Sequence, residues 1–101
     1  MKNNNHCIPT DALKGKPGKG ESFRLIDVRS REEYEQQHIP GAIHITLDQL
    51  EHSLKEFDQK IKYITICGKG GGRSARAAAI LQSAGFQASW LCGGTLGWDF
   101  E

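Results

Sequence analysis

Short apolar runs divide the chain into units of strand length. The densest covers residues 23–28; others cover residues 63–66 and 86–91, and a brief alternating run covers 43–45. Dense apolar runs of this length are typical of strands that are buried on both faces of a parallel sheet. The pattern therefore predicts four strands at these positions.

The segments between these runs carry helical signals. Ser30 and Glu33 form a capping-box pattern, which predicts a short helix from residue 31 to about residue 37. Thr46 begins a second capping box, and the alanine-rich residues 74–84 predict a third helix. Apolar residues at helical spacing follow Thr46, namely Leu47, Leu50, Leu54 and Phe57.

Strands that alternate with helices predict an α/β fold, with a mainly parallel central sheet and helices on both faces. Residues 1–7 are predicted to form a flexible N-terminal segment, and residues 8–101 a single domain. Within that domain we expect a short strand and one helical turn in residues 8–13, and an exposed loop in the glycine-rich residues 14–21. A final helical turn is expected from Leu96.

The composition narrows the classes of function. The 101 residues carry a formal net charge of +1 with both signs mixed, so no basic surface for nucleic acid or an anionic membrane is predicted. No apolar run has membrane-spanning length, and the first residues lack the apolar core of a signal peptide. We therefore expect a cytoplasmic protein, a monomer or weak dimer.

The chain has three cysteines, Cys7, Cys67 and Cys92. An odd number at wide spacing argues against a disulfide framework or a zinc site, and favours thiol chemistry in a reducing compartment. No metal or organic cofactor is predicted. His44 has no metal-ligand spacing to a second ligand and is expected to be structural.

A glycine-saturated loop, residues 67–74, stands between the third strand and the third helix. Its glycines allow consecutive backbone N–H groups to point inward as an anion-binding nest, and the helix start adds a positive dipole end. Arg73 adds a permanent charge. In this field the thiolate of Cys67 is favoured over the thiol, which predicts a nucleophile. The expected substrate-binding residues are Gly68, Lys69, Gly70, Gly71, Gly72 and Arg73.

Two other glycine motifs do not fit this loop. A dinucleotide fingerprint needs a third glycine where Arg73 stands, and a P-loop needs Gly-Lys followed by Ser or Thr at the helix start. What remains is Cys-x5-Arg-Ser between a strand and a helix, which is an arrangement of enzymes that pass a group through a cysteine thiolate.

Four separated motifs, in order, resemble a single-domain rhodanese. They are residues 25–29 (LIDVR), residues 33–42 with Glu-Tyr and HIPGA, Cys67 with its loop, and residues 93–98 (GGTLGW). The resemblance implies a rhodanese-like three-layer α/β fold and a sulfurtransferase that carries sulfane sulfur as a persulfide on Cys67. It also implies that Asp27 and Arg29 are a structural pair near the site, that Arg73 is the loop arginine, and that Ser74 supports the site.

The partners implied by the resemblance are small sulfur-containing anions or persulfides as donors, with cyanide or a thiol, including a thiol protein, as acceptor.

One departure leaves an alternative open. Many single-domain sulfurtransferases of this family have four residues between the cysteine and the loop arginine, whereas residues 68–72 are five. The longer spacing resembles phosphatases and arsenate reductases of the same fold, although Ile66 stands where those phosphatases have a histidine. A further alternative is a non-catalytic binding module, against which the presence of Cys67 and Arg73 argues.

Two further side-chain roles remain open. Cys92 follows the strand of residues 86–91, whose carboxyl end lies at the same edge of the sheet as that of residues 63–66. Cys92 could therefore lie near Cys67 and resolve it after oxidation. The favoured interpretation is that Cys92 is a small apolar filler at a buried turn. The acidic residues Glu32, Glu33 and Glu35 are expected to complement a helix dipole and to be solvated rather than catalytic.

Overall fold

The computed structural model describes residues 7–13, 23–98 and 100. Its centre is a 5-stranded sheet in the order β1-β5-β4-β2-β3, in which every pairing is parallel. The predicted parallel sheet is therefore confirmed. The strands are β1 (Cys7–Ile8), β2 (Phe23–Asp27), β3 (Ile43–His44), β4 (Lys62–Ile66) and β5 (Gln87–Leu91).

The helices of the described residues follow the predicted segments closely. The α-helices are α1 (Arg31–Gln36), α2 (Leu47–Ser53) and α3 (Gly72–Ser83). Three short 3-10 helices accompany them: η1 (Thr10–Leu13), η2 (Leu54–Glu56) and η3 (Thr95–Gly97). No helix among these is long and apolar enough to cross a membrane. The predicted loop at residues 14–21 lies outside the described residues.

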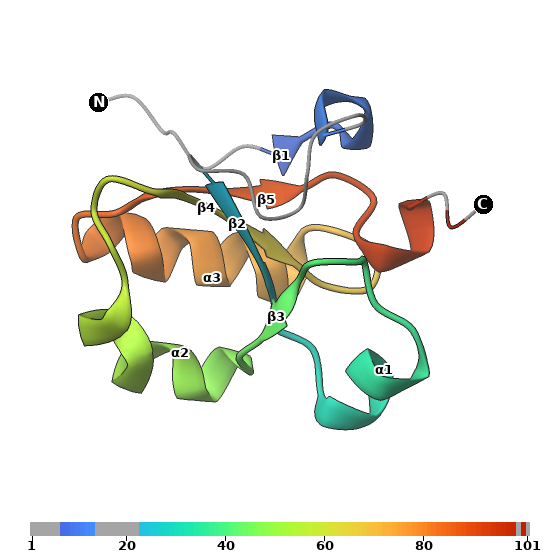
Figure 1. The fold of residues 1–101 in the computed structure, drawn as a ribbon, viewed down its shortest axis with the longest axis horizontal. Helices are drawn as coiled ribbons and strands as arrows, with labels where there is room; N and C mark the ends of the chain where they lie inside the picture. Colours follow the sequence, from blue (N-terminus) through green and yellow to red (C-terminus); the bar gives the residue numbers. More distant parts are fainter. Residues whose placement is uncertain (1–6, 14–22, 99, 101) are drawn as a thin grey trace.

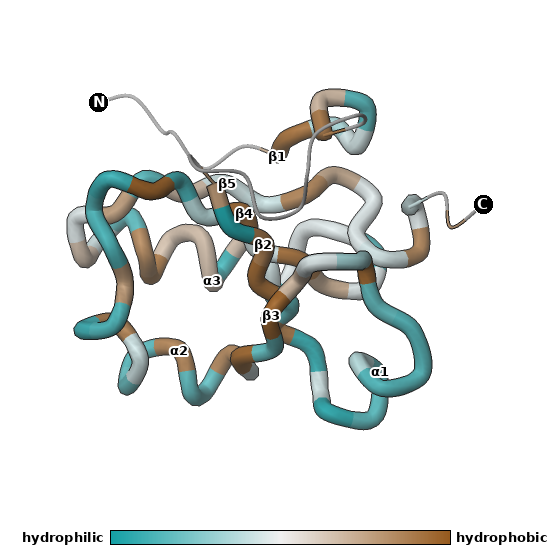
Figure 2. The backbone as a smooth tube through the Cα atoms, viewed as in Figure 1, coloured by the Kyte–Doolittle hydropathy of each residue, from teal (hydrophilic) through white to brown (hydrophobic). Residues whose placement is uncertain are grey.

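Both faces of the sheet are covered, as the three-layer prediction requires. One face packs against α2 and α3 through a core that contains Ile26, Leu50, Tyr63 and Leu81. The other face buries a second core, which contains Leu25, Ile39, Ile64, Leu91 and, from η1, Leu13. In Figure 1, η1 lies on the opposite side of the sheet from α2. Figure 2 shows mainly hydrophobic residues along β2 and mainly hydrophilic residues in α1. None of the residues of α1 is buried.

Local signals explain where the helices begin and end. Ser30 accepts a hydrogen bond from the N–H of Glu33, and Glu33 accepts one from the N–H of Ser30, so the predicted capping box starts α1. α3 begins at Gly72, two positions before the predicted start. It is followed by Gly85, whose φ of 96° suits a residue without a side chain.

The N-terminal boundary of the ordered fold differs from the prediction. Cys7, which was assigned to a flexible segment, lies in β1, and its register partner in β5 is Trp90. The backbone N–H of Cys92 also donates to the carbonyl of Ile8 at 2.9 Å. A short strand was predicted in residues 8–13, but its position at the edge of the sheet beside β5 depends on contacts distant in sequence.

The prediction that the cysteines favour thiol chemistry over a disulfide is wrong for two of the three. Cys7 and Cys92 form a disulfide, with their Cα atoms 5.0 Å apart, and only Cys67 is free. Parallel pairing of β1 with β5 brings the two cysteines within the Cα separation that a disulfide spans. Cys92 is therefore neither the small apolar filler nor the resolving thiol that the sequence suggested.

Candidate functional site

Cys67 follows directly after β4, at the carboxyl edge of the sheet, which is where ligands bind in open α/β sheets. The residue is 4% exposed. Its Sγ donates to the carbonyl oxygen of Gly71 at 3.1 Å and lies 3.2 Å from Oγ of Ser74. The Ser74 hydroxyl in turn donates to the same Gly71 carbonyl at 2.9 Å. The thiol, the hydroxyl and one peptide oxygen thus form a closed triangle at the start of α3.

The glycines of the loop allow this geometry. Gly70, Gly71 and Gly72 all have positive φ, so the chain curls into a conformation that L side chains rarely adopt. The sequence predicted N–H groups alone around the sulfur, but the loop also turns the Gly71 carbonyl toward it. The thiol is a weak donor, and this carbonyl gives the buried sulfur an acceptor.

The backbone donors of the loop are nevertheless free for a ligand. Among the described residues, no backbone N–H group from Gly68 to Arg73 donates a hydrogen bond. Unpaired N–H groups at the start of a helix attract anions. Lys69 is exposed at the loop. The loop can therefore hold a small anion beside Cys67.

Arg73 makes a contact that the sequence did not predict. Its Nη1 and Nη2 donate to the two carboxylate oxygens of Glu33 in α1, at 2.9 Å and 3.2 Å. Hydrogen bonding to Glu33 raises the pKa of Arg73 above its usual value. Glu33 was expected only to cap and complement its own helix, because a contact across 40 positions of the chain has no local sequence signal.

Asp27 and Arg29 form a buried ion pair one strand away from the nucleophile. Arg29 Nη2 lies 2.8 Å from Asp27 Oδ2, and Arg29 Nε bonds both oxygens of the carboxylate. Arg29 Nη2 also donates to the carbonyl of Gln37 at 2.6 Å. Asp27 is the register partner of Ile66, so the pair fixes the chain that leaves β2 beside Cys67. Nε2 of His44 lies 2.8 Å from the carbonyl of Arg29, which gives this histidine a structural contact.

The turn after β5 holds the main chain of the nucleophile, which the sequence did not reveal. The N–H groups of Thr95 and Leu96 donate to the carbonyls of Cys67 and Gly68, at 2.8 Å and 2.9 Å. Gly94 lies so close that a side chain there would collide with the same two carbonyls. The motif of residues 93–98 was visible in the sequence, but its contact with the loop was not.

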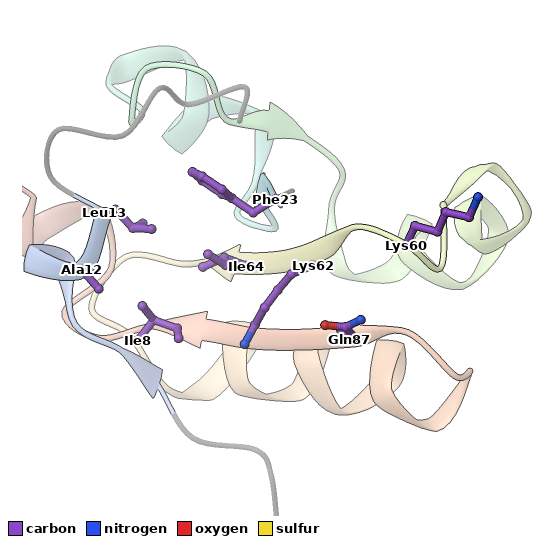
Figure 3. A pocket seen from close by; sticks show the side chains of 8 residues that line it. All are labelled: Ile8, Ala12, Leu13, Phe23, Lys60, Lys62, Ile64 and Gln87. Atoms are coloured by element: carbon purple, nitrogen blue, oxygen red, sulfur yellow. The ribbon is translucent and has the colours of Figure 1, made fainter. Parts of the chain in front are cut away.

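A separate pocket of about 400 Å³ lies away from this site (Figure 3). It is lined by the first residues of three strands, Phe23, Lys62 and Gln87, together with side chains of β1 and η1. The pocket extends along one face of the sheet, from the first residues of these strands to Ile8, which pairs with Leu91 at the end of β5, and Cys67 is not among its lining residues.

The comparisons with known proteins agree with this geometry. The chain matches the model of the rhodanese-like domain over residues 9–101. It is 35% identical over 94 residues to YtwF of Bacillus subtilis, described as a sulfurtransferase, covering 93% of this chain and 90% of YtwF. It is 39% identical over 80 residues to YrkF of the same organism, described as a sulfur carrier protein; that match covers 79% of this chain and 43% of YrkF.

A solved structure has the same architecture. The rhodanese-like domain protein of Staphylococcus aureus superposes with a TM-score of 0.83 at 33% identity, and the match covers 95% of this chain and 93% of that one. The family match spans β2 to β5, the loop and Cys67. The chain therefore belongs to the rhodanese-like family, whose sulfurtransferase members support a role in sulfur transfer.

Proposed function

We propose that this protein transfers sulfane sulfur from thiosulfate or a persulfide donor to a thiophilic acceptor through a persulfide on Cys67. The observation that carries the proposal is the free thiol of Cys67 beside a loop in which the backbone N–H groups of residues 68–73 have no partner among the described residues. A nucleophile and an anion-binding site must be adjacent for an anionic donor to react.

In the first step the Cys67 thiol loses its proton to solvent and the thiolate attacks the outer sulfur of thiosulfate. The sulfur–sulfur bond of the donor breaks, and sulfite leaves with the electron pair. In the second step the acceptor attacks the terminal sulfur of the persulfide, and Cys67 departs as the thiolate. Atoms and charge balance without a cofactor, and cyanide would leave as thiocyanate.

Several groups of the chain are placed to stabilise the charges of these steps. The loop N–H groups of residues 68–72 are proposed to bind the donor oxygens, with Lys69 contributing an unpaired positive charge and Arg73 one that its ion pair with Glu33 weakens. Ser74 is proposed to turn its hydroxyl from the Gly71 carbonyl to the ionised sulfur, which lies 3.2 Å away. Asp27 and Arg29 are proposed to support the loop rather than to touch the donor.

The five-residue spacing between Cys67 and Arg73 keeps phosphatase or arsenate reductase chemistry as a second candidate. Two observations weigh against it. Asp27 is fully buried and both of its oxygens bind Arg29, so it cannot protonate a leaving alkoxide. Arg73, the residue that would bind an oxyanion, is paired with Glu33. A non-catalytic binding module, the third candidate, would not need a free thiol beside unpaired backbone N–H groups.

The test is intact-mass spectrometry after treatment with thiosulfate. We expect one added sulfur in the wild-type protein, its removal by cyanide with formation of thiocyanate, and no addition in Cys67→Ser. Hydrolysis of an aryl phosphate or thiol-dependent reduction of arsenate is measured in parallel. Turnover in either of those assays, with no sulfur added from thiosulfate or from an alkyl persulfide, would overturn the proposal.

A further inference from the structure

The ion pair of Arg73 with Glu33 joins the start of α3 to the first turn of α1. Both terminal nitrogens of the guanidinium are used in it, and the side chains are 44% and 39% exposed. A bidentate pair holds the guanidinium in one orientation, in addition to the attraction between the two charges. The loop arginine is thus held by a carboxylate from another element.

Glu33 is itself fixed from two sides. Its Oε1 accepts the N–H of Ser30 at 3.0 Å as well as Nη1 of Arg73. The hydrogen bonds from Arg73 and from Ser30 lower the pKa of Glu33 to about 2. The carboxylate therefore stays charged at the pH where a thiolate reacts.

The charges around Cys67 nearly cancel as a result. Asp27 compensates Arg29, and Glu33 compensates Arg73. Lys69 forms no ion pair among the described residues, so one positive charge and the loop N–H groups remain for the donor. Such a site suits an anion with one charge better than one with two, because the second charge meets the carboxylate of Glu33.

We propose that Glu33 determines donor specificity: by holding Arg73, it disfavours dianionic donors such as thiosulfate and favours donors with at most one charge, such as alkyl persulfides. The inference rests on the proposed function and names its donor class. Glu33 acts through Arg73 and is therefore a positioning residue rather than a catalytic one.

The decisive variant is Glu33→Gln. Glutamine at this helix position can still accept from the N–H of Ser30, so the capping box is retained while the charge is lost. Glu35→Gln is the matched control, since it breaks the Arg31–Glu35 ion pair of the same helix. Ser30→Ala removes the other half of the capping box and reports the effect of a weakened helix start alone.

Loading of Cys67 is measured with thiosulfate and with an alkyl persulfide, using cyanide as the common acceptor and sulfate as a competing dianion. In Glu33→Gln we expect kcat/KM for thiosulfate to rise about three- to tenfold, while that for the alkyl persulfide changes less than about twofold. Sulfate should inhibit the variant more strongly, and the difference between the two donors should shrink at high salt. Glu35→Gln and Ser30→Ala should leave the ratio between donors unchanged.

An unchanged ratio of kcat/KM between the two donors would overturn the inference. A purely structural role for Glu33 predicts that result, because it would change both values equally or not at all. The same shift of the ratio in Ser30→Ala would also overturn it. If wild-type Cys67 takes sulfur from neither donor, the failure lies in the proposed function, and the inference falls with it.

Discussion

The backbone N–H of Thr95 donates to the carbonyl oxygen of Cys67 at 2.8 Å, so the turn after β5 holds the main chain of the nucleophile. A neighbouring hydrogen bond joins Leu96 to Gly68 in the same way. The tightest point of this contact is Gly94, whose φ of 56° and lack of a side chain let the two backbones meet. The position of the reactive sulfur therefore depends on a segment that is distant in sequence.

Gly94→Ala should damage both the fold and the site. The new methyl group would lie 2.7 Å from the carbonyl oxygen of Gly68 and would also collide with that of Cys67. We expect a loss of at least about 1–3 kcal/mol in the free energy of unfolding from the backbone conformation alone, and slower sulfur loading. Urea unfolding and loading rates measure the two effects. Gly97→Ala is the control, because a side chain there meets nothing within 4 Å; equal effects of the two variants would contradict the role of Gly94.

Ser74→Ala should slow the formation of the persulfide more than it affects the fold. A hydrogen bond to a charged group contributes about 1.5–3 kcal/mol, so we expect loading of Cys67 at neutral pH to fall about tenfold or more. Ser89→Ala is a suitable control, since Ser89 is also buried, at 2% exposure. Its register partner in the sheet is Ile64, three residues before Cys67, so it lies away from the sulfur. Similar loading rates in Ser74→Ala and the wild type would show that the hydroxyl does not assist the sulfur.

The Arg73–Glu33 pair should make stability depend on pH in acid. The pKa of Glu33 is lowered in the folded protein from 4.5 to about 2, chiefly by the hydrogen bond from Arg73. A lowered pKa stabilises the fold above the unfolded value, and this stabilisation is lost as the pH falls from about 4.5 toward 2. The stability difference between the wild type and Glu33→Gln should therefore narrow across that window in urea unfolding. A difference that stays constant with pH, or that narrows equally for Glu35→Gln, would contradict this prediction.

The disulfide should stabilise the fold without taking part in catalysis. Reducing Cys7–Cys92, or replacing both residues with serine, should lower the free energy of unfolding by about 2–4 kcal/mol, because the link closes a loop with a sequence separation of 85. The double-serine variant should be insensitive to reductant and should still add one sulfur at Cys67. Identical unfolding midpoints of the wild type with and without reductant would refute the stabilising role.

Features with local causes could be predicted from the sequence. The start of α1 depends on Ser30 and Glu33, which are three residues apart, and the loop at Cys67 depends on glycines that adjoin it. The parallel sheet follows from the alternation of strand and helix patterns. These parts of the prediction agree with the structure because each signal and its effect lie in the same short segment.

Features that depend on distant contacts could not be predicted in this way. The count of cysteines does not reveal that β1 lies beside β5, and this neighbourhood brings Cys7 to Cys92. Arg73 could be placed at the loop, but its partner Glu33 depends on how α1 sits against α3. The orientation of the Gly71 carbonyl depends on a peptide that glycine leaves free to adopt many conformations.

The disulfide also limits the number of sulfur atoms that one molecule can carry. With Cys7 and Cys92 joined, each chain offers a single reactive sulfur, so a thiol-specific label should attach once per molecule. A loaded Cys67 has no second thiol in its own chain to take the sulfur by exchange. Discharge is then bimolecular, with a rate that is first order in the outside acceptor, and the lifetime of the loaded state is set by the acceptor concentration around the protein.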